Sequence, residues 1–226
     1  MKTTLCLLAS FVSLSMPARA DRPLVSETAD VIPSGDCQVE TAAARVTSRG
    51  ALSTTGLNAL FSCGVLGNHQ AALGYGDARS GGRSEQSLYV GGKSTLIAPA
   101  AGVTGLGVGY GIGLLKSAGL SFDHESSMVV AVLTRELSAG LLGHVNLGWS
   151  RSQSARQNSA LWSLGFEHGS DRVFAADLFG DDRGKPWLSA GMGWSLADKL
   201  SVNLAGALQF EKPKVKNLSV GFKIIY

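Results

Sequence analysis

The sequence of 226 residues predicts an all-β fold, an antiparallel transmembrane β-barrel of about twelve strands. Three observations lead to this prediction: an N-terminal signal sequence, a repeated alternation of apolar with small or polar residues, and a composition that is 45% hydrophobic but only 16% charged. After the signal, no stretch reaches the about 18 consecutive apolar residues that indicate a transmembrane helix. Strands therefore have to account for the apolar content.

The first twenty residues have the three parts of a secretory signal peptide. Lys2 gives a positive start, residues 5–16 (LCLLASFVSLSM) form a short apolar run, and PARA ends it with small residues. The run is shorter than the about 20 residues that a membrane-spanning helix needs, so we expect cleavage after Ala20 rather than a membrane anchor. The predicted organisation is a signal peptide (1–20), a short lead (21–36) and the barrel (37–226).

Alternation of period 2 recurs along the rest of the chain, which places two kinds of residue on two faces of a sheet. In GLGVGYGIG, Leu106 and Val108 alternate with Gly105 and Gly107. A face of glycine, serine, alanine and asparagine suits a barrel lumen better than the water-exposed face of a soluble sandwich, so we expect the apolar face to contact lipid. The expected strands are residues 37–46, 57–65, 69–76, 87–97, 103–113, 127–134, 141–149, 160–167, 172–180, 186–196, 200–210 and 217–226.

The connections and the aromatic residues favour the same fold. Connections after even-numbered strands are short, whereas those after odd-numbered strands are longer and polar, apart from residues 181–185. Periplasmic turns and longer outer loops are typical of outer-membrane barrels, as are aromatic girdles at both membrane interfaces. The aromatic residues near expected strand ends are Tyr75, Tyr89, Tyr110, Trp149, Trp162, Trp187 and Phe210 on the loop side, and Phe166, Phe174, Trp194 and Tyr226 on the turn side.

Two cysteines remain once Cys6 leaves with the signal. Cys37 opens the first expected strand and Cys63 lies near the end of the second, so antiparallel pairing brings both to the turn end. In an oxidising compartment this predicts a disulfide, with two free buried thiols as the alternative. Two cysteines without a histidine at ligand spacing do not complete a metal site, and we expect neither metal nor cofactor.

The final residues, NLSVGFKIIY, resemble the last strand of an outer-membrane barrel. Val220, Phe222, Ile224 and Tyr226 are apolar or aromatic at every second position. The resemblance implies that these residues are the membrane-insertion signal read by the bacterial barrel-assembly machinery. The last strand also has to pair with the first, because lipid cannot satisfy an open sheet edge.

A narrower resemblance lies in RPLVSETADVIPSGDCQVE (22–40) and in residues 178–210. Both are similar to a family of outer-membrane proteins linked to meta-pathway phenol degradation, whose members open with a Thr/Ser–Glu–Thr/Asp-x-Asp stretch followed by Pro-x-Gly and Gln-x-Glu. The resemblance implies passage of hydrophobic or aromatic small molecules. The matching positions are Ser26, Glu27, Thr28, Asp30, Pro33, Gly35, Gln38 and Glu40.

Strand parity places a small set of polar residues inside the barrel, and these are the candidate pore-lining residues. They either select solutes by size and charge or form a salt-bridged interior that fills a narrow barrel. The lead before the first strand either folds into the lumen as a plug or stays in the periplasm. The candidates are Gln38, Glu40, Lys93, His144, Asn146, Glu167, Asp177 and Lys223.

Catalysis and nucleic-acid binding are disfavoured. His168, Ser170 and Asp171 resemble the His-x-Ser and acid of lipid A deacylases, but Gly-Ser-Asp is ordinary turn composition. GLGVGYGIG contains a G-x-G-x-x-G with no helix after it, as a dinucleotide site requires. Removing Lys2 and Arg19 from 20 basic residues leaves 18 against 17 acidic ones, which gives no basic surface for nucleic acid.

The sequence therefore predicts a channel or transporter-like barrel for small solutes in the bacterial outer membrane, in contact with lipid and lipopolysaccharide. The alternative is a structural or surface-interaction barrel without an open pore, whose loop cations contact lipopolysaccharide phosphates or a partner. These cations are Arg79, Arg83, Arg151, Arg156, Lys212, Lys214 and Lys216.

Overall fold

A computed structural model describes residues 25–48, 50, 52–117, 120–211 and 214–226. The predicted signal peptide (1–20), residues 21–24 and Lys212 lie outside the described residues. The described part of the chain forms twelve strands that correspond one to one with the alternating segments of the sequence. They are β1 (Cys37–Ser48), β2 (Thr54–Leu66), β3 (His69–Ser80), β4 (Arg83–Ile97), β5 (Gly105–Ser117), β6 (Asp123–Ser138), β7 (Leu141–Ser152), β8 (Gln157–His168), β9 (Arg172–Asp181), β10 (Trp187–Ala197), β11 (Leu200–Gln209) and β12 (Val215–Ile225).

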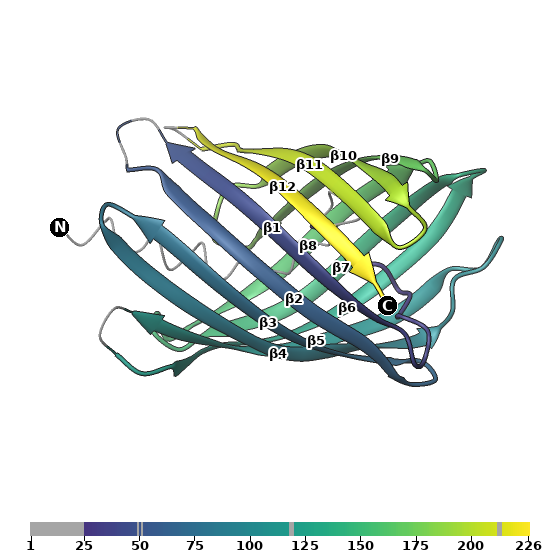
Figure 1. Ribbon diagram of the computed structural model, residues 1–226, viewed down its shortest axis with the longest axis horizontal. Coiled ribbons are helices and arrows are strands. Elements are labelled where there is room, and N and C mark those ends of the chain that lie inside the picture. Colours follow the sequence, from purple (N-terminus) through teal and green to yellow (C-terminus); the bar gives the residue numbers. More distant parts are fainter. Residues whose placement is uncertain (1–24, 49, 51, 118–119, 212–213) are drawn as a thin grey trace.

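Each strand pairs antiparallel with its neighbours in sequence, and β12 closes the barrel by pairing with β1 (Figure 1). We call the end with the β2–β3 and β10–β11 connections the turn end, and the opposite end the loop end. Both the start of β1 and the end of β12 lie at the turn end, where the backbone N–H of Tyr226 donates to the carbonyl of Cys37. Within the described residues, no helix is long and apolar enough to cross a membrane.

The burial pattern of the strands is inverted relative to a soluble protein. In β7, His144 and Asn146 are almost fully buried, whereas Val145 and Leu147 between them are exposed. Alternation of this kind puts polar residues inside and large apolar residues outside, as a barrel in lipid requires. The fold prediction, a closed antiparallel barrel of transmembrane type, is confirmed.

The predicted difference in connection length between the two ends holds only in part. The connections after β2, β6, β8 and β10 have two or three residues, but those at the loop end are also short, with at most five. The polar stretches expected as long loops are largely strand: β3 and β4 continue to a turn at residues 81–82, and β7 and β8 to a turn at residues 153–156. The longest connection, residues 98–104, lies at the turn end. Strands can stay paired where both faces are polar, so apolar alternation marks only part of their length.

Two of the predicted girdle aromatics point inward instead. Trp187 is only 6% exposed and stacks on Phe179 with ring centroids 6.3 Å apart. Tyr89 lines a pocket in the lumen together with Lys93. The girdle prediction considered only how near each aromatic residue lies to the end of its strand. Residues an even number apart face the same side of a strand, so Trp187 faces inward like buried Ser189, and Tyr89 like buried Lys93.

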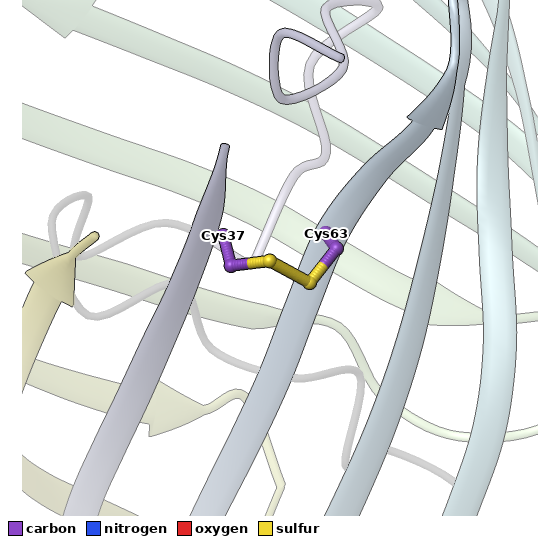
Figure 2. Close-up of a disulfide and its surroundings, with 2 residues drawn as sticks. All are labelled: Cys37 and Cys63. Atoms are coloured by element: carbon purple, nitrogen blue, oxygen red, sulfur yellow. A yellow bond between two sulfur atoms is a disulfide. The ribbon is translucent and has the colours of Figure 1, made fainter. Parts of the chain in front are cut away.

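The predicted disulfide is confirmed. Cys37 and Cys63 are directly opposite each other in the β1–β2 register, and their sulfur atoms are bonded (Figure 2). The bond joins the beginning of β1 to the turn-end part of β2. It therefore fixes the point at which the chain enters the barrel wall.

Removing this disulfide is expected to lower the free energy of unfolding. The bond closes a loop with a sequence separation of 26, for which the chain-entropy relation gives about 3–4 kcal/mol. Urea unfolding of the Cys37→Ser/Cys63→Ser variant in lipid vesicles, followed by tryptophan fluorescence, measures the change. The wild-type protein treated with reductant should match the variant, and a loss below about 1 kcal/mol would contradict a stabilising bond at this position.

Candidate functional site: the lumen and its N-terminal segment

The residues that precede β1 lie inside the barrel. Residues 25–36, which we call the N-terminal segment, contact inward-facing groups of β2, β3, β4, β6, β7 and β9. Ser26, Thr28 and Ala29 are buried, with Thr28 and Ala29 fully so. Of the two locations that the sequence left open for this lead, the described part of it occupies the lumen.

Side chains of the wall bind the backbone of this segment. Asn146 accepts from the N–H of Glu27 at 2.9 Å and donates to its carbonyl at 3.1 Å, as a neighbouring strand would. Asp177 accepts from the N–H groups of Val25 and Ser26 and from the Ser26 hydroxyl. These contacts satisfy polar backbone groups that would otherwise be buried without a partner.

Three further wall side chains continue this pattern toward the turn end. The Ala29 N–H donates to Thr134 Oγ1 at 2.9 Å, and the Ala29 carbonyl accepts from Thr95 Oγ1 at 2.6 Å. The Ile32 N–H donates to Gln70 Oε1 at 3.2 Å. In these contacts the wall side chains bind backbone groups of the segment rather than its side chains.

An ion pair joins Lys93 of the wall to Glu27 of the segment. Lys93 Nζ donates to Glu27 Oε2 at 3.2 Å and to the Thr28 carbonyl at 2.9 Å. The Lys93 side chain is 5% exposed and that of Glu27 is 18% exposed. A cation buried to this degree needs an anionic or strongly polar partner.

The segment leaves the lumen at β2 through backbone contacts. Ser34 forms a bridge with Gly64, the Gly35 N–H donates to the Gly64 carbonyl, and the Gly64 N–H donates to the Asp36 carbonyl. A Cβ at position 64 would lie 2.2 Å from the Pro33 carbonyl oxygen. Only glycine permits this approach.

The other candidate lumen residues form pairs along the wall. His144 Nε2 lies 3.7 Å from Glu167 Oε1, and His144 Nδ1 is hydrogen-bonded to Thr134. Gln38 donates to Glu40 at 2.6 Å, and Glu40 is opposite Lys223 in the β1–β12 register. The structure thus buries seven of the eight candidates and half-buries Lys223, while their role in lining a pore stays a prediction.

Next to the N-terminal segment, the lumen contains a pocket bounded by β1 to β6. Its empty space is about 570 Å³, including the part that opens to solvent. Glu27, Lys93 and Gln70 line it on the side of the segment. The remaining wall is largely apolar apart from Gln38, Glu40 and Ser62, and its larger apolar and aromatic side chains are Leu60, Tyr89, Tyr110, Met128, Val130 and Val132.

Sequence reasoning missed several residues that hold the segment or line the pocket. Gln70, Thr95 and Thr134 have lumen parity, but only charged residues, His144 and a few amides were selected as candidates. Tyr89 and Met128 share that parity, but Tyr89 was assigned to an aromatic girdle and Met128 was not selected. Selecting every inward-facing side chain larger than alanine would have found them.

The remaining candidates lie outside the lumen. His168, Ser170 and Asp171 are exposed at the β8–β9 turn. The loop-end cations in the described part of the chain are exposed as well, and Arg79 pairs with Asp77 at 2.9 Å. Among the described residues, no group of three or more His, Cys, Asp or Glu side chains is arranged to hold a metal ion.

Comparison with known sequences identifies one family. Residues 8–225 match the family described as Uncharacterised conserved protein UCP029691. No curated protein has a matching sequence. The resemblance to the phenol-degradation family is not confirmed by these comparisons.

Several solved structures have the same fold. The KdgM porin in complex with disordered oligogalacturonate is 6% identical, with a TM-score of 0.60 over 83% of this chain and 98% of that chain. The CymD monoaromatic hydrocarbon channel is 10% identical, with a TM-score of 0.51 over 86% and 88%. Outer membrane phospholipase A from Escherichia coli is 10% identical, with a TM-score of 0.53 over 83% and 92%. Because the identities are this low, the likeness concerns the fold, which channels share with an enzyme.

Proposed function

This chain belongs to the family described as Uncharacterised conserved protein UCP029691, and we propose that it forms a channel for small solutes across the bacterial outer membrane. In this proposal the N-terminal segment holds the channel closed. The barrel wall contacts lipid and lipopolysaccharide, and its last strand is recognised by the barrel-assembly machinery. We propose no catalytic role.

The observation that carries the proposal is that the N-terminal segment, and not the wall side chains alone, occupies part of the lumen. A separate segment lies in the lumen and is held there through hydrogen bonds to wall side chains. The wall behind it is rich in small residues: β5 presents Gly105, Gly107 and Gly109 inward. Barrels of about 8 strands are filled by their own side chains, whereas those of 16–18 strands leave a channel. A twelve-stranded barrel with a separate segment in its lumen fits a gated channel.

The neighbouring folds support a channel over a catalytic barrel. The KdgM and CymD proteins are named as a porin and a channel. The candidate Ser170 and His168 of the β8–β9 turn are exposed and do not line the lumen pocket. Passage of hydrophobic or aromatic solutes, which the sequence resemblance implies, is part of the proposal and is supported by the apolar pocket wall.

A filled structural barrel is the alternative, and one observation favours it. Inward polar residues have partners within the lumen: Lys93 pairs with Glu27, and His144 Nε2 lies 3.7 Å from Glu167 Oε1. Such pairs make a closed interior stable without further function.

Conductance in planar bilayers distinguishes the gated channel from the filled structural barrel. The mature protein should conduct weakly, and a chain that starts at Pro33 should conduct steadily, because it lacks the backbone that the wall binds but keeps the disulfide. Heat-modifiable migration on a gel provides the folding control for both proteins. If the correctly folded shortened chain does not conduct, the result would support a filled structural barrel and overturn the proposed channel.

A further inference from the structure

The pocket beside the N-terminal segment combines an apolar wall with one buried cation. Leu60, Met128 and Val130 belong to the wall, and Lys93 lies where the wall meets the segment. The Glu27 carboxylate is bound to Lys93 and also lines the pocket. A molecule in the pocket therefore lies beside the ion pair that holds the segment.

Lys93 is the cation among the residues that line this pocket, and it is therefore the candidate site for an anion. Glu40 is the further charged residue that lines it, and it is opposite Lys223 on the neighbouring strand and bonded to Gln38. Glu27 comes from the segment, whereas Lys93 belongs to the wall. If Glu27 moves away, Lys93 loses this carboxylate but keeps its place in the wall.

We propose that this pocket binds a small amphipathic carboxylate, whose carboxylate replaces Glu27 on Lys93 and so releases the N-terminal segment. The proposal rests on the channel function proposed above. The apolar body of the ligand contacts Leu60, Tyr89 and Met128. In the absence of ligand, the Glu27 carboxylate occupies the position on Lys93 that the ligand's carboxylate would take.

The selectivity for a carboxylate follows from the cost of an unpaired buried charge. A neutral ligand that displaced Glu27 would take a carboxylate away from Lys93 and supply no charge in its place, which is unfavourable for a buried cation. A carboxylate restores a charge-assisted hydrogen bond to Nζ. The bond from Lys93 to the Thr28 carbonyl couples this exchange to the segment, because a shift of Nζ toward the ligand weakens it.

Benzoate and benzyl alcohol form a matched pair of probes, since they share a ring and differ in charge. Binding to the full mature protein in detergent micelles is measured by calorimetry. Benzoate should bind at least about tenfold more tightly than benzyl alcohol, the ratio expected for a hydrogen bond to a charged group. Equal affinities for the two probes would overturn the proposal.

Two substitutions test the exchange at Lys93. Glu27→Gln weakens the built-in competitor and should tighten benzoate binding about tenfold, while Asp30→Asn, an equal charge change at an exposed position of the segment, should leave it unchanged. Lys93→Met should abolish benzoate binding. Should Lys93→Met fail to fold, the comparison of Glu27→Gln with Asp30→Asn decides, and equal affinities in those two variants would overturn the proposal.

Conductance shows whether binding releases the segment. Benzoate should raise the conductance of the full mature chain and have no such effect on the chain that starts at Pro33. If the shortened chain conducts while benzoate does not bind, the ligand site is wrong and the channel stands. If benzoate binds through Lys93 while the shortened chain is silent, the site stands and the channel is wrong. If the shortened chain conducts and benzoate binds the full chain without raising its conductance, benzoate binding does not release the N-terminal segment, and that part of the proposal is wrong.

Discussion

Replacing Gly64 by valine is expected to open the full-length barrel to ions without unfolding it. At this position a Cβ would lie 2.2 Å from the Pro33 carbonyl oxygen and 2.3 Å from that of Ile32. Both atoms belong to the backbone and cannot turn aside as a side chain could. The N-terminal segment therefore has to move away from β2.

The strand itself tolerates the substitution. Gly64 does not have a positive φ, so a β-branched residue is compatible with its backbone. Overpacking typically costs about 1–3 kcal/mol, which corresponds to a change of roughly 5- to 150-fold in the ratio of closed to open barrels. The conductance of the full mature chain should approach that of the chain that starts at Pro33.

Gly56→Val is the matched control for this experiment. Gly56 lies on the same strand with the same parity, and a Cβ there would meet only the Asp77 carbonyl oxygen, at an ordinary 3.7 Å. Conductance should stay at the wild-type level in this variant. If Gly64→Val and Gly56→Val behave alike in planar bilayers, the contact at Gly64 does not hold the segment in the closed position.

The strands and their faces could be predicted because a β-strand imposes a period of two on its side chains. In β7, His144 and Asn146 alternate with Val145 and Leu147, and the structure puts the first pair inside and the second outside. The cysteine pairing followed from the same rule, once the first two strands were taken as antiparallel neighbours. These features depend on local pattern alone.

The position of the N-terminal segment could not be predicted in this way. Residues 25–36 have no period, and their wall partners are far away in sequence: Val25 bonds to Asp177 and Ala29 to Thr134. Apart from the Ser26 hydroxyl and the Glu27 carboxylate, the hydrogen bonds to the wall involve backbone atoms of the segment, which every residue carries, so the sequence of the segment does not identify its binding site. Strand ends were misjudged for a related reason, since backbone pairing continues where apolar alternation has stopped.

Placing an arginine at Leu147 is expected to destabilise the barrel in lipid. Leu147 is 59% exposed and lies in the middle of β7, opposite Ala131 of β6 and Trp162 of β8. Arginine on the lipid face of a barrel costs about 2–4 kcal/mol at the bilayer midplane and much less near the interfaces. Urea titration in lipid vesicles should therefore show a loss of about this size for Leu147→Arg.

The control places the same residue on the other face. Asn58 has the parity of buried Ser62 on β2 and is exposed within the lumen, where an arginine can keep its charge in water. Asn58→Arg should change the free energy of unfolding by less than about 1 kcal/mol. Equal losses in the two variants would mean that both faces meet similar surroundings, and the outer face would not be the lipid face. Because a solute path through the lumen requires lipid on the outside and water on the inside, the difference between these two arginines tests the premise on which the proposed channel depends.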